Sequence, residues 1–272
     1  MIDLLTITND PELAARCDRL EGMRVFVDLE RNGKAERQKG LDTFISKHDM
    51  KDVARIKAAL KKTKLMVRVN PLQMDAPELT RAEVDAVLAE GADMLMLPMF
   101  TGAAQIGAFA DMVNGRAPIV ALLETAGALT SLEEWVGTPG IQEVLIGLND
   151  LHLSLGCRFM FEPLLMGHVD RVAAVVKRQG LRLGFGGIAR VEEGVLPGRD
   201  VLGEHIRLGS QAVILSRTFN RAGGEKSFEE AVAAIRAAEA ALTTRTAEQT
   251  EQDRVRVAGL IRQLSQPPKV PA

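Results

Sequence analysis

Two acidic residues of this chain, Glu124 and Asp150, occupy positions where a metal site could form. Glu124 directly follows the apolar run Ile119–Leu123, and Asp150 comes shortly after the run Val144–Gly147. If both runs are neighbouring parallel strands, their ends lie about 4.8 Å apart, close enough for both carboxylates to ligate one ion. Two such carboxylates repel each other. Mg²⁺, which uses one or two protein carboxylates and keeps several waters, would remove that repulsion.

A second interpretation is that each carboxylate pairs with a structural arginine. Arg68 is a candidate of special interest because it ends the apolar run Leu65–Val69 and could share the pocket with the metal. A guanidinium offers a planar fork that fits a carboxylate or enolate oxygen, which a lysine cannot reproduce. A metal and an arginine in one pocket suit a 2-oxo acid or an acyl enolate, with the metal acting as a Lewis acid. Arg68 as a salt-bridge partner remains the alternative, and the other candidate arginines are Arg190 and Arg217.

Further polar residues follow the remaining apolar runs. Gly186 and Gly187 either approach a substrate carboxylate or phosphate or form a turn after their strand, and we favour the turn. The histidines His48 and His152 could reach the site, although structural roles are the simpler reading for both. The other strand-end candidates are Asp28, Glu30 and Ser216.

The elements that must position these residues form an alternating β/α pattern. Helical segments separate nearly all of the apolar runs, among them Pro11–Leu20, Pro77–Glu90 and Pro163–Gln179. This alternation predicts a parallel sheet, and eight runs favour an α/β fold of the (β/α)₈ TIM-barrel type, in which functional residues lie at the C-terminal strand ends. The eight runs are Leu4–Thr8, Arg24–Leu29, Leu65–Val69, Met94–Pro98, Ile119–Leu123, Val144–Gly147, Arg182–Gly186 and Ala212–Leu215.

The C-terminal part reads as an extra helical extension. We predict a barrel domain over residues 1–242, whose last helix is Ser227–Leu242, and an extension with a tail over 243–272. Residues 243–264 could continue as a helix that packs on a partner subunit. They could equally form a solvated tail that orders only in part.

Composition narrows the classes of function. The 272 residues carry 34 basic and 36 acidic side chains, a net charge of −2, so no broad basic field is available for nucleic acid. The two cysteines are far apart and indicate no metal-ligand pair or oxidising compartment. No signal peptide or membrane span is expected, because no apolar segment is long enough. We therefore expect a soluble cytoplasmic protein.

Five segments, taken in order, resemble the 2-keto-acid aldolase/citrate lyase β-subunit (HpcH/HpaI) family of the phosphoenolpyruvate/pyruvate barrel superfamily. They are VFVDLE, MVRVNP, GADMLMLPMF, ALLETAGAL and IGLNDLHLSLG, and the likeness covers roughly residues 23–217. ETAGAL together with GLNDLHLSLG is the most specific part.

This resemblance implies that Glu124 and Asp150 ligate Mg²⁺ or Mn²⁺ and that Arg68 binds the substrate's carbonyl and carboxylate. It also implies that Asp28 or Glu30 orients a metal-bound water or the substrate. Family members cleave or form carbon–carbon bonds, and they often form trimers or hexamers that exchange C-terminal helices. We therefore expect a homo-oligomeric, metal-dependent lyase (class II type aldolase) that works next to a pyruvate or oxaloacetate unit through a metal-stabilised enolate.

The sequence departs from the family pattern after Asp28. Pyruvate aldolases of this family carry a histidine there as general base, whereas this chain reads DLERNG. We therefore expect a metal-bound hydroxide, helped by Asp28 or Glu30, to act as base. DLE is more like the citrate-lyase and malyl-CoA-lyase branch, so a β-hydroxyacyl-CoA thioester is an alternative substrate. Candidate contacts to the CoA phosphates are Lys34, Arg37 and Lys39. A third hypothesis is a barrel without catalysis that serves as a binding subunit.

Overall fold

Eight parallel strands close into a barrel in the computed structural model, which describes residues 1–33, 47–220 and 227–266. Each strand pairs with the next, and β8 pairs with β1, so the predicted (β/α)₈ TIM barrel is confirmed. The strands are β1 (Asp3–Ile7), β2 (Met23–Asp28), β3 (Leu65–Arg68), β4 (Met94–Leu97), β5 (Ile119–Leu123), β6 (Ile141–Ile146), β7 (Arg182–Ile188) and β8 (Ala212–Leu215).

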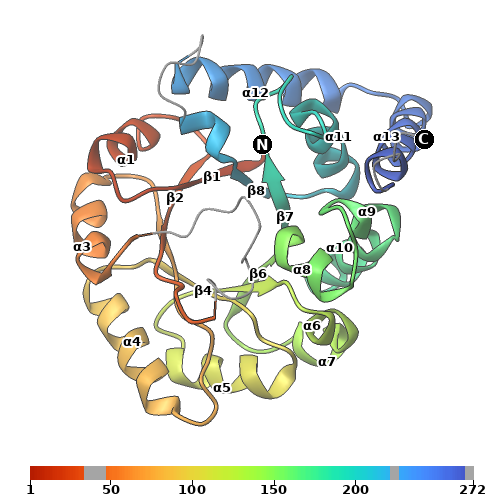
Figure 1. Ribbon diagram of the computed structural model, residues 1–272. Coiled ribbons are helices and arrows are strands. Elements are labelled where there is room, and N and C mark those ends of the chain that lie inside the picture. Colours follow the sequence, from red (N-terminus) through yellow and green to blue (C-terminus); the bar gives the residue numbers. More distant parts are fainter. Residues whose placement is uncertain (34–46, 221–226, 267–272) are drawn as a thin grey trace, which may run out of the picture.

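Helices surround the strands on the outside (Figure 1). Their bounds are α1 (Pro11–Cys17), α3 (Met50–Ala59), α4 (Pro77–Ala89), α5 (Ala103–Val113), α6 (Ala126–Thr130), α7 (Leu132–Trp135), α8 (Leu148–Ser154), α9 (Glu162–Leu165), α10 (His168–Arg178), α11 (Gly198–Leu208), the 3₁₀ turn η1 (Arg217–Asn220), α12 (Phe228–Thr243) and α13 (Ala247–Leu264).

The barrel strands are buried on both faces, as expected for parallel strands in a barrel. Alternate residues point outward to the helices, as Val25 and Val27 of β2 do, or inward, as Phe26 does. The inward-facing residues fill the barrel with a small apolar cluster, so the interior is a packed core. Inward-facing residues placed beyond this cluster therefore lie at one of the two mouths of the barrel.

Local signals explain the helix boundaries. Asp10 accepts a hydrogen bond from the Glu12 N–H at the start of α1, where Pro11 is the first helical residue. α4 ends just before Gly91, which has a φ of +96°. The single helix predicted over Pro163–Gln179 is wrong. Gly167 adopts a left-handed conformation and separates α9 from α10.

The C-terminal extension folds against its own barrel. A break at residues 244–246 follows α12, and the new helix α13 begins with a capping box formed by Thr246 and Gln249. α13 contacts α9 and α11 at the side of the barrel, where Val257 and Ile261 are buried (Figure 1). The reading of this segment as a partly ordered tail is therefore wrong for 247–264. Packing on a partner subunit stays a prediction.

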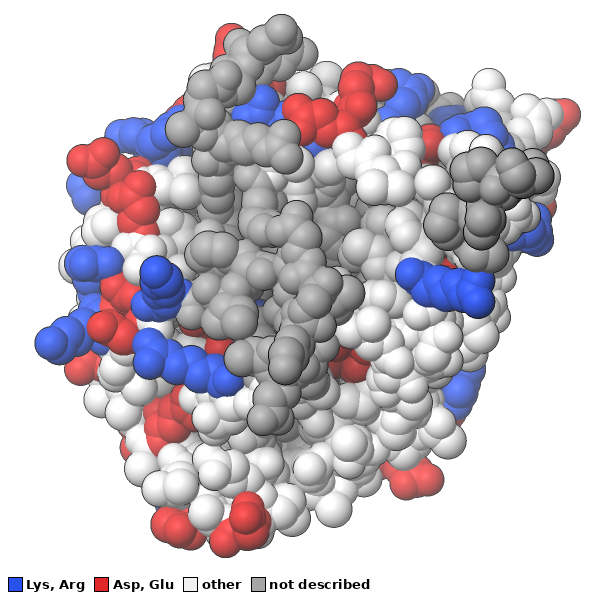
Figure 2. Space-filling model, viewed as in Figure 1, with Lys and Arg blue, Asp and Glu red and all other residues white. Residues whose placement is uncertain are grey.

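Charged side chains of both signs alternate around the rim of the face seen in Figure 2, and the described residues form no broad basic patch there. None of the described helices combines the length and the apolar character needed to cross a membrane.

Candidate metal centre

Asp28 and Arg68 lie side by side at the C-terminal mouth of the barrel. They are register partners on β2 and β3, and each comes two residues after an inward-facing core residue, Phe26 and Met66 respectively. Strand alternation therefore points both side chains into the mouth. The Arg68 guanidinium carbon also lies 5.4 Å from the centroid of the Phe26 ring, so the arginine makes a cation–π contact with the barrel core.

Arg68 and Asp28 form a bidentate ion pair. Arg68 Nε donates to Asp28 Oδ1 at 2.9 Å and Nη2 donates to Oδ2 at 2.8 Å, while Glu30 Oε2 lies 3.5 Å from Nε. Burial by itself would lower the pKa of Arg68, but the charges of Asp28, Glu30 and Glu124 outweigh burial and raise it. The arginine is therefore permanently charged, with two of its three nitrogens held by Asp28.

Glu124 is a buried carboxylate of the mouth whose charged form is disfavoured by its surroundings. Its side chain is 2% exposed, and Oε1 accepts a hydrogen bond from the Met99 N–H at 2.9 Å. Burial raises the pKa of Glu124 to about 8; Asp150 and Glu30 add repulsion, which Arg68 and the Met99 hydrogen bond offset only in part. No ion pair joins Glu124 to a basic side chain among the described residues, because Arg68 is engaged with Asp28 and Glu30.

Hydrogen bonds between the segments that follow β4 and β5 fix the backbone next to Glu124. The Thr125 hydroxyl donates to the Phe100 carbonyl at 2.8 Å and accepts the Ala128 N–H, which caps α6. A Cβ at Gly127 would lie 2.7 Å from the Thr101 carbonyl oxygen, so only glycine allows this approach. The ETAG segment thus locks one strand end to its neighbour.

Gly147 and α8 bring Asp150 to the same mouth. The Gly147 N–H donates to the Leu123 carbonyl at 2.9 Å, so Gly147 lies beside Glu124. The helix α8 begins directly after Gly147, and Asp150 lies half-buried in its first turn. Glu124 and Asp150 thus lie at the same mouth, where burial, with the charge of Asp150 in addition, raises the pKa of Glu124. Metal ligation by this pair stays a prediction.

His48 and Asn70 organise the segment that follows β2. His48 is buried, and its Nδ1 accepts a hydrogen bond from the Asp28 N–H at 3.1 Å. Asn70 Oδ1 accepts from the N–H groups of Arg31 and Asn32 at 2.9 and 3.1 Å. The sequence suggested that His48 could reach the site, but it indicated no role for Asn70. The only available signal was its position at the end of β3 in VRVNP.

His152 has a structural contact instead. Its Nδ1 lies 3.1 Å from the Leu148 carbonyl, four residues earlier in α8, and the carbonyl can only accept, so Nδ1–H donates. This hydrogen bond holds Nδ1 within its own helix. The structural reading of His152 is the one that the geometry supports.

The glycine pair lies inside β7, so the predicted turn at Gly186 and Gly187 is wrong. The strand continues to Ile188 through an irregularity in its pairing with β8. Gly186 has a φ of +53°, and a Cβ there would lie 2.9 Å from Leu148 Cδ1. Gly186 therefore makes room for the start of α8, and contact of either glycine with substrate stays a prediction.

The last candidates lie after β7 and β8. Ser216 is half-buried, and its hydroxyl lies 2.9 Å from that of Thr218, while its role in substrate binding stays a prediction. Arg190 approaches the Phe219 carbonyl at 3.4 Å and pairs with neither carboxylate. The side chain of Arg217 and the residues Lys34, Arg37 and Lys39 lie outside the described part of the chain.

The residues of the mouth fit a hard divalent cation. In the described residues no group of three or more His, Cys, Asp or Glu side chains surrounds one point, so Glu124 and Asp150 would act as a pair. A pair of carboxylates with waters is the usual protein ligand set of Mg²⁺. A buried glutamate that neighbouring acids repel is stabilised by such a cation.

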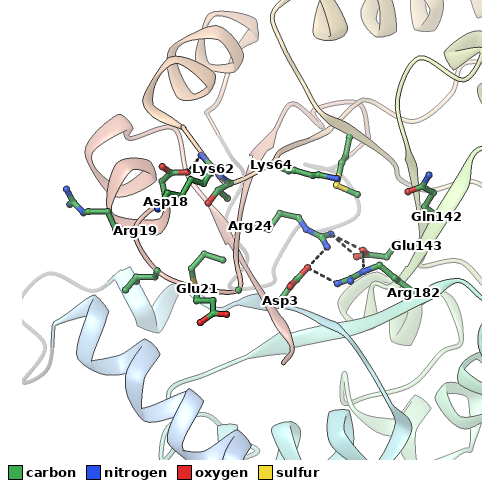
Figure 3. Close-up of a pocket in the computed structure, with 15 residues that line it drawn as sticks. Asp3, Asp18, Arg19, Glu21, Arg24, Lys62, Lys64, Gln142, Glu143 and Arg182 are labelled. Carbon is green, nitrogen blue, oxygen red and sulfur yellow. Dashed lines mark hydrogen bonds and ion pairs between the residues drawn. The ribbon is translucent and has the colours of Figure 1, made fainter.

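A cavity of about 530 Å³ lies at the opposite, N-terminal mouth (Figure 3). Arg24 and Arg182 cross it and pair with Asp3 and Glu143 at N–O distances of 2.7–3.3 Å. Two arginines neutralise two carboxylates within the chain at this mouth, and the active sites of such barrels lie at the other, C-terminal mouth. We assign the chemistry to the C-terminal mouth.

The HpcH/HpaI aldolase/citrate lyase family model matches residues 6–163, which is more than half of the chain. The chain belongs to this family. A (3S)-malyl-CoA thioesterase of Cereibacter sphaeroides is 32% identical over 101 residues, which are 37% of this chain and 34% of the relative. The match thus spans about a third of that relative's length.

Solved structures show the same fold. An HpcH/HpaI aldolase from Desulfitobacterium hafniense aligns with a TM-score of 0.58 and 16% identity, over 99% of this chain and 95% of its own. An HpcH/HpaI aldolase/citrate lyase family protein from Burkholderia cenocepacia aligns with a TM-score of 0.60 and 18% identity, over 89% and 93%. The matched family is thus described as aldolases and citrate lyases, the curated relative as a CoA thioesterase, and the solved structures show the fold alone.

Proposed function

We propose that this chain is a divalent-metal-dependent carbon–carbon lyase that cleaves or forms an aldol bond next to a 2-oxo acid unit, pyruvate or oxaloacetate. The observation that carries this proposal is the buried carboxylate of Glu124, which Asp150 and Glu30 destabilise and which has no ion-pair partner among the described residues. Family membership supports the reaction class. Mg²⁺ or Mn²⁺, held by Glu124 and Asp150, would supply Lewis-acid polarisation of the 2-oxo group.

Arg68 is placed to receive the substrate's oxygen atoms. Its Nε and Nη2 are held by Asp28, and Nη1 makes no hydrogen bond to the described residues. The guanidinium can therefore donate from Nη1 to the carboxylate or carbonyl of a 2-oxo acid while Asp28 fixes its plane. The same donor stabilises the negative charge that develops on the carbonyl oxygen when the carbon–carbon bond breaks.

We assign different roles to Asp28 and Glu30, the two acids at the end of β2. Both oxygens of Asp28 accept hydrogen bonds from Arg68, and Oδ1 also accepts the Glu30 N–H at 3.2 Å. Asp28 therefore orients the guanidinium. Of the two acids, Glu30 is the one we assign to proton transfer with the aldol hydroxyl.

Metal titration tests the proposal. Calorimetry with Mg²⁺ and Mn²⁺ should show binding to wild type and loss of binding in Glu124→Gln and in Asp150→Asn. Glu133→Gln, an exposed acid that pairs with Arg171 on the surface, is the matched control and should bind as wild type does. Unchanged metal affinity in Glu124→Gln would contradict the proposal, and absence of metal-dependent turnover in wild type would favour a barrel without catalysis.

A CoA thioester is the second candidate substrate, favoured by the likeness to a (3S)-malyl-CoA thioesterase. The two candidates differ in their products. A panel of 4-hydroxy-2-oxo acids should release pyruvate in the presence of Mg²⁺, whereas malyl-CoA should release neither acetyl-CoA nor free CoA. The reverse result would replace the 2-oxo acid with a thioester. We further expect a homo-oligomer, for which sedimentation is the measurement.

A further inference from the structure

The two oxygens of Glu124 have different surroundings. Oε1 accepts the Met99 N–H at 2.9 Å. Oε2 lies on the other side, over Gly147, where an added Cβ would come within 2.8 Å of Oε2 and 3.0 Å of the Glu124 Cβ. One oxygen is thus held by the chain, and the other faces the residue that leads into the helix of Asp150.

The backbone of Gly147 does not itself require glycine. Its φ of −80° and ψ of 81° are open to residues that carry a side chain. The need for glycine at this position is therefore one of space, because the Glu124 side chain and Leu122 Cδ1, at 3.3 Å, occupy the volume of a methyl group. The space that a side chain at position 147 would take is occupied by the Glu124 carboxylate.

Met99 holds the other oxygen through an unusual backbone conformation. Its φ is +56°, a left-handed value that is uncommon for a residue other than glycine. The bond from Thr125 to the Phe100 carbonyl lies next to this turn and ties it to the end of β5. Strained backbone of this kind is found where the surroundings fix a functional group.

We propose that Gly147 is a positioning residue of the metal site: it leaves room for Glu124 to present Oε2 to the cation while the Met99 N–H occupies Oε1. This assignment rests on the proposed function, because it needs a cation between Glu124 and Asp150. It predicts that Glu124 binds the metal through one oxygen and that a single methyl group at position 147 disturbs the site. The cation is the ligand concerned, and Gly147 acts only through Glu124.

Gly147→Ala is the direct test, with Mg²⁺ alone as the probe in calorimetry. We expect affinity to fall about 10- to 100-fold, the usual effect of disturbing a residue that supports a metal ligand. Gly107→Ala is the matched control, because this helical glycine has no atom within 4 Å of an added Cβ and should keep wild-type affinity. Equal affinity of wild type and Gly147→Ala would overturn this assignment alone. Failure of wild type to bind Mg²⁺ or Mn²⁺ would overturn the proposed function as well.

A stability measurement covers the case in which Gly147→Ala does not fold. Thermal unfolding of the substitution is compared in wild type and in a Glu124→Gly background, which removes every atom of the Glu124 side chain that an alanine at 147 would meet, Cβ included. We expect the loss of Tm to be at least halved in that background, since the two positions then no longer clash. An equal loss of Tm in both backgrounds, or failure to fold in both, would contradict the contact on which the assignment depends.

Discussion

Two buried glutamates at opposite mouths of the barrel have opposite surroundings. Glu143, near the start of β6, is 0% exposed and accepts hydrogen bonds from Arg24 Nη1 at 3.0 and 2.9 Å and from Arg182 Nε at 3.3 Å. Glu124, at the end of β5, is 2% exposed and accepts one backbone N–H, while burial and, in addition, nearby acids raise its pKa. The chain neutralises the first glutamate by itself. The second has an electrostatic need that a bound cation would meet.

This difference shows that the mouth with a sizeable cavity need not be the mouth that carries the chemistry. The N-terminal mouth holds a cavity of about 530 Å³, yet its central charges are matched within the chain (Figure 3). A satisfied ion-pair network stabilises a fold only modestly but is costly to break from one side. The C-terminal mouth keeps a carboxylate at an energetic cost, which is typical of a functional site.

The largest expected effect is the loss of Glu143. Glu143→Gln removes the buried negative charge from the bidentate partner of Arg24 and should lower the free energy of unfolding by about 3–5 kcal/mol. Urea denaturation followed by circular dichroism measures this loss. Glu133→Gln on the surface serves as control, and a loss in Glu143→Gln no larger than in that control would remove the contrast between the two mouths.

Glu124→Gln should have the opposite sign in metal-free protein. The pKa of Glu124 is about 8 in the fold against an ordinary value of 4.5, so this carboxyl stabilises the fold fully below pH 4.5. Its contribution is lost as the pH rises from 4.5 towards 8. At pH 8 with a chelator, Glu124→Gln should therefore unfold with a free energy about 1–3 kcal/mol higher than wild type.

Added Mg²⁺ should offset most or all of this difference in stability. At a concentration of about 100 times Kd, a ligand that binds only the folded state stabilises it by about 2.7 kcal/mol. Wild type should gain this stability and Glu124→Gln should not, as measured by Tm with and without chelator. If metal-free Glu124→Gln is less stable than wild type at pH 8, other residues of the chain already stabilise the charged form of Glu124, and the prediction is contradicted.

The smallest expected effect distinguishes the two arginines of the N-terminal mouth. The side chain of Arg182 is 40% exposed, whereas that of Arg24 is 7% exposed and contacts both Asp3 and Glu143. Because solvent screens the outer arginine, Arg182→Gln should lower the free energy of unfolding by only about 0.5–1 kcal/mol. The shift of the urea midpoint measures this value, and a loss as large as that of Glu143→Gln would place Arg182 among the essential partners.

Much of the barrel could be predicted from local patterns in the sequence. The predicted strands at Ile119–Leu123 and Ala212–Leu215 match β5 and β8 residue for residue, because short apolar runs between helices record burial on both faces. The helix break at Gly167 was missed. An isolated glycine within a helical pattern is often tolerated, and only its left-handed φ of 76° shows the break.

The sequence by itself determined the (β/α)₈ barrel and the placement of Asp28, Arg68 and Glu124 at one mouth, because parallel strands send consecutive ends to one mouth. Only the tertiary structure decided what each acid meets there. Arg68 engages Asp28 and leaves Glu124 without an ion pair in the described chain, and His48 returns to the end of β2 from twenty residues away. These contacts depend on distances between segments remote in sequence, which residue patterns along the chain do not encode.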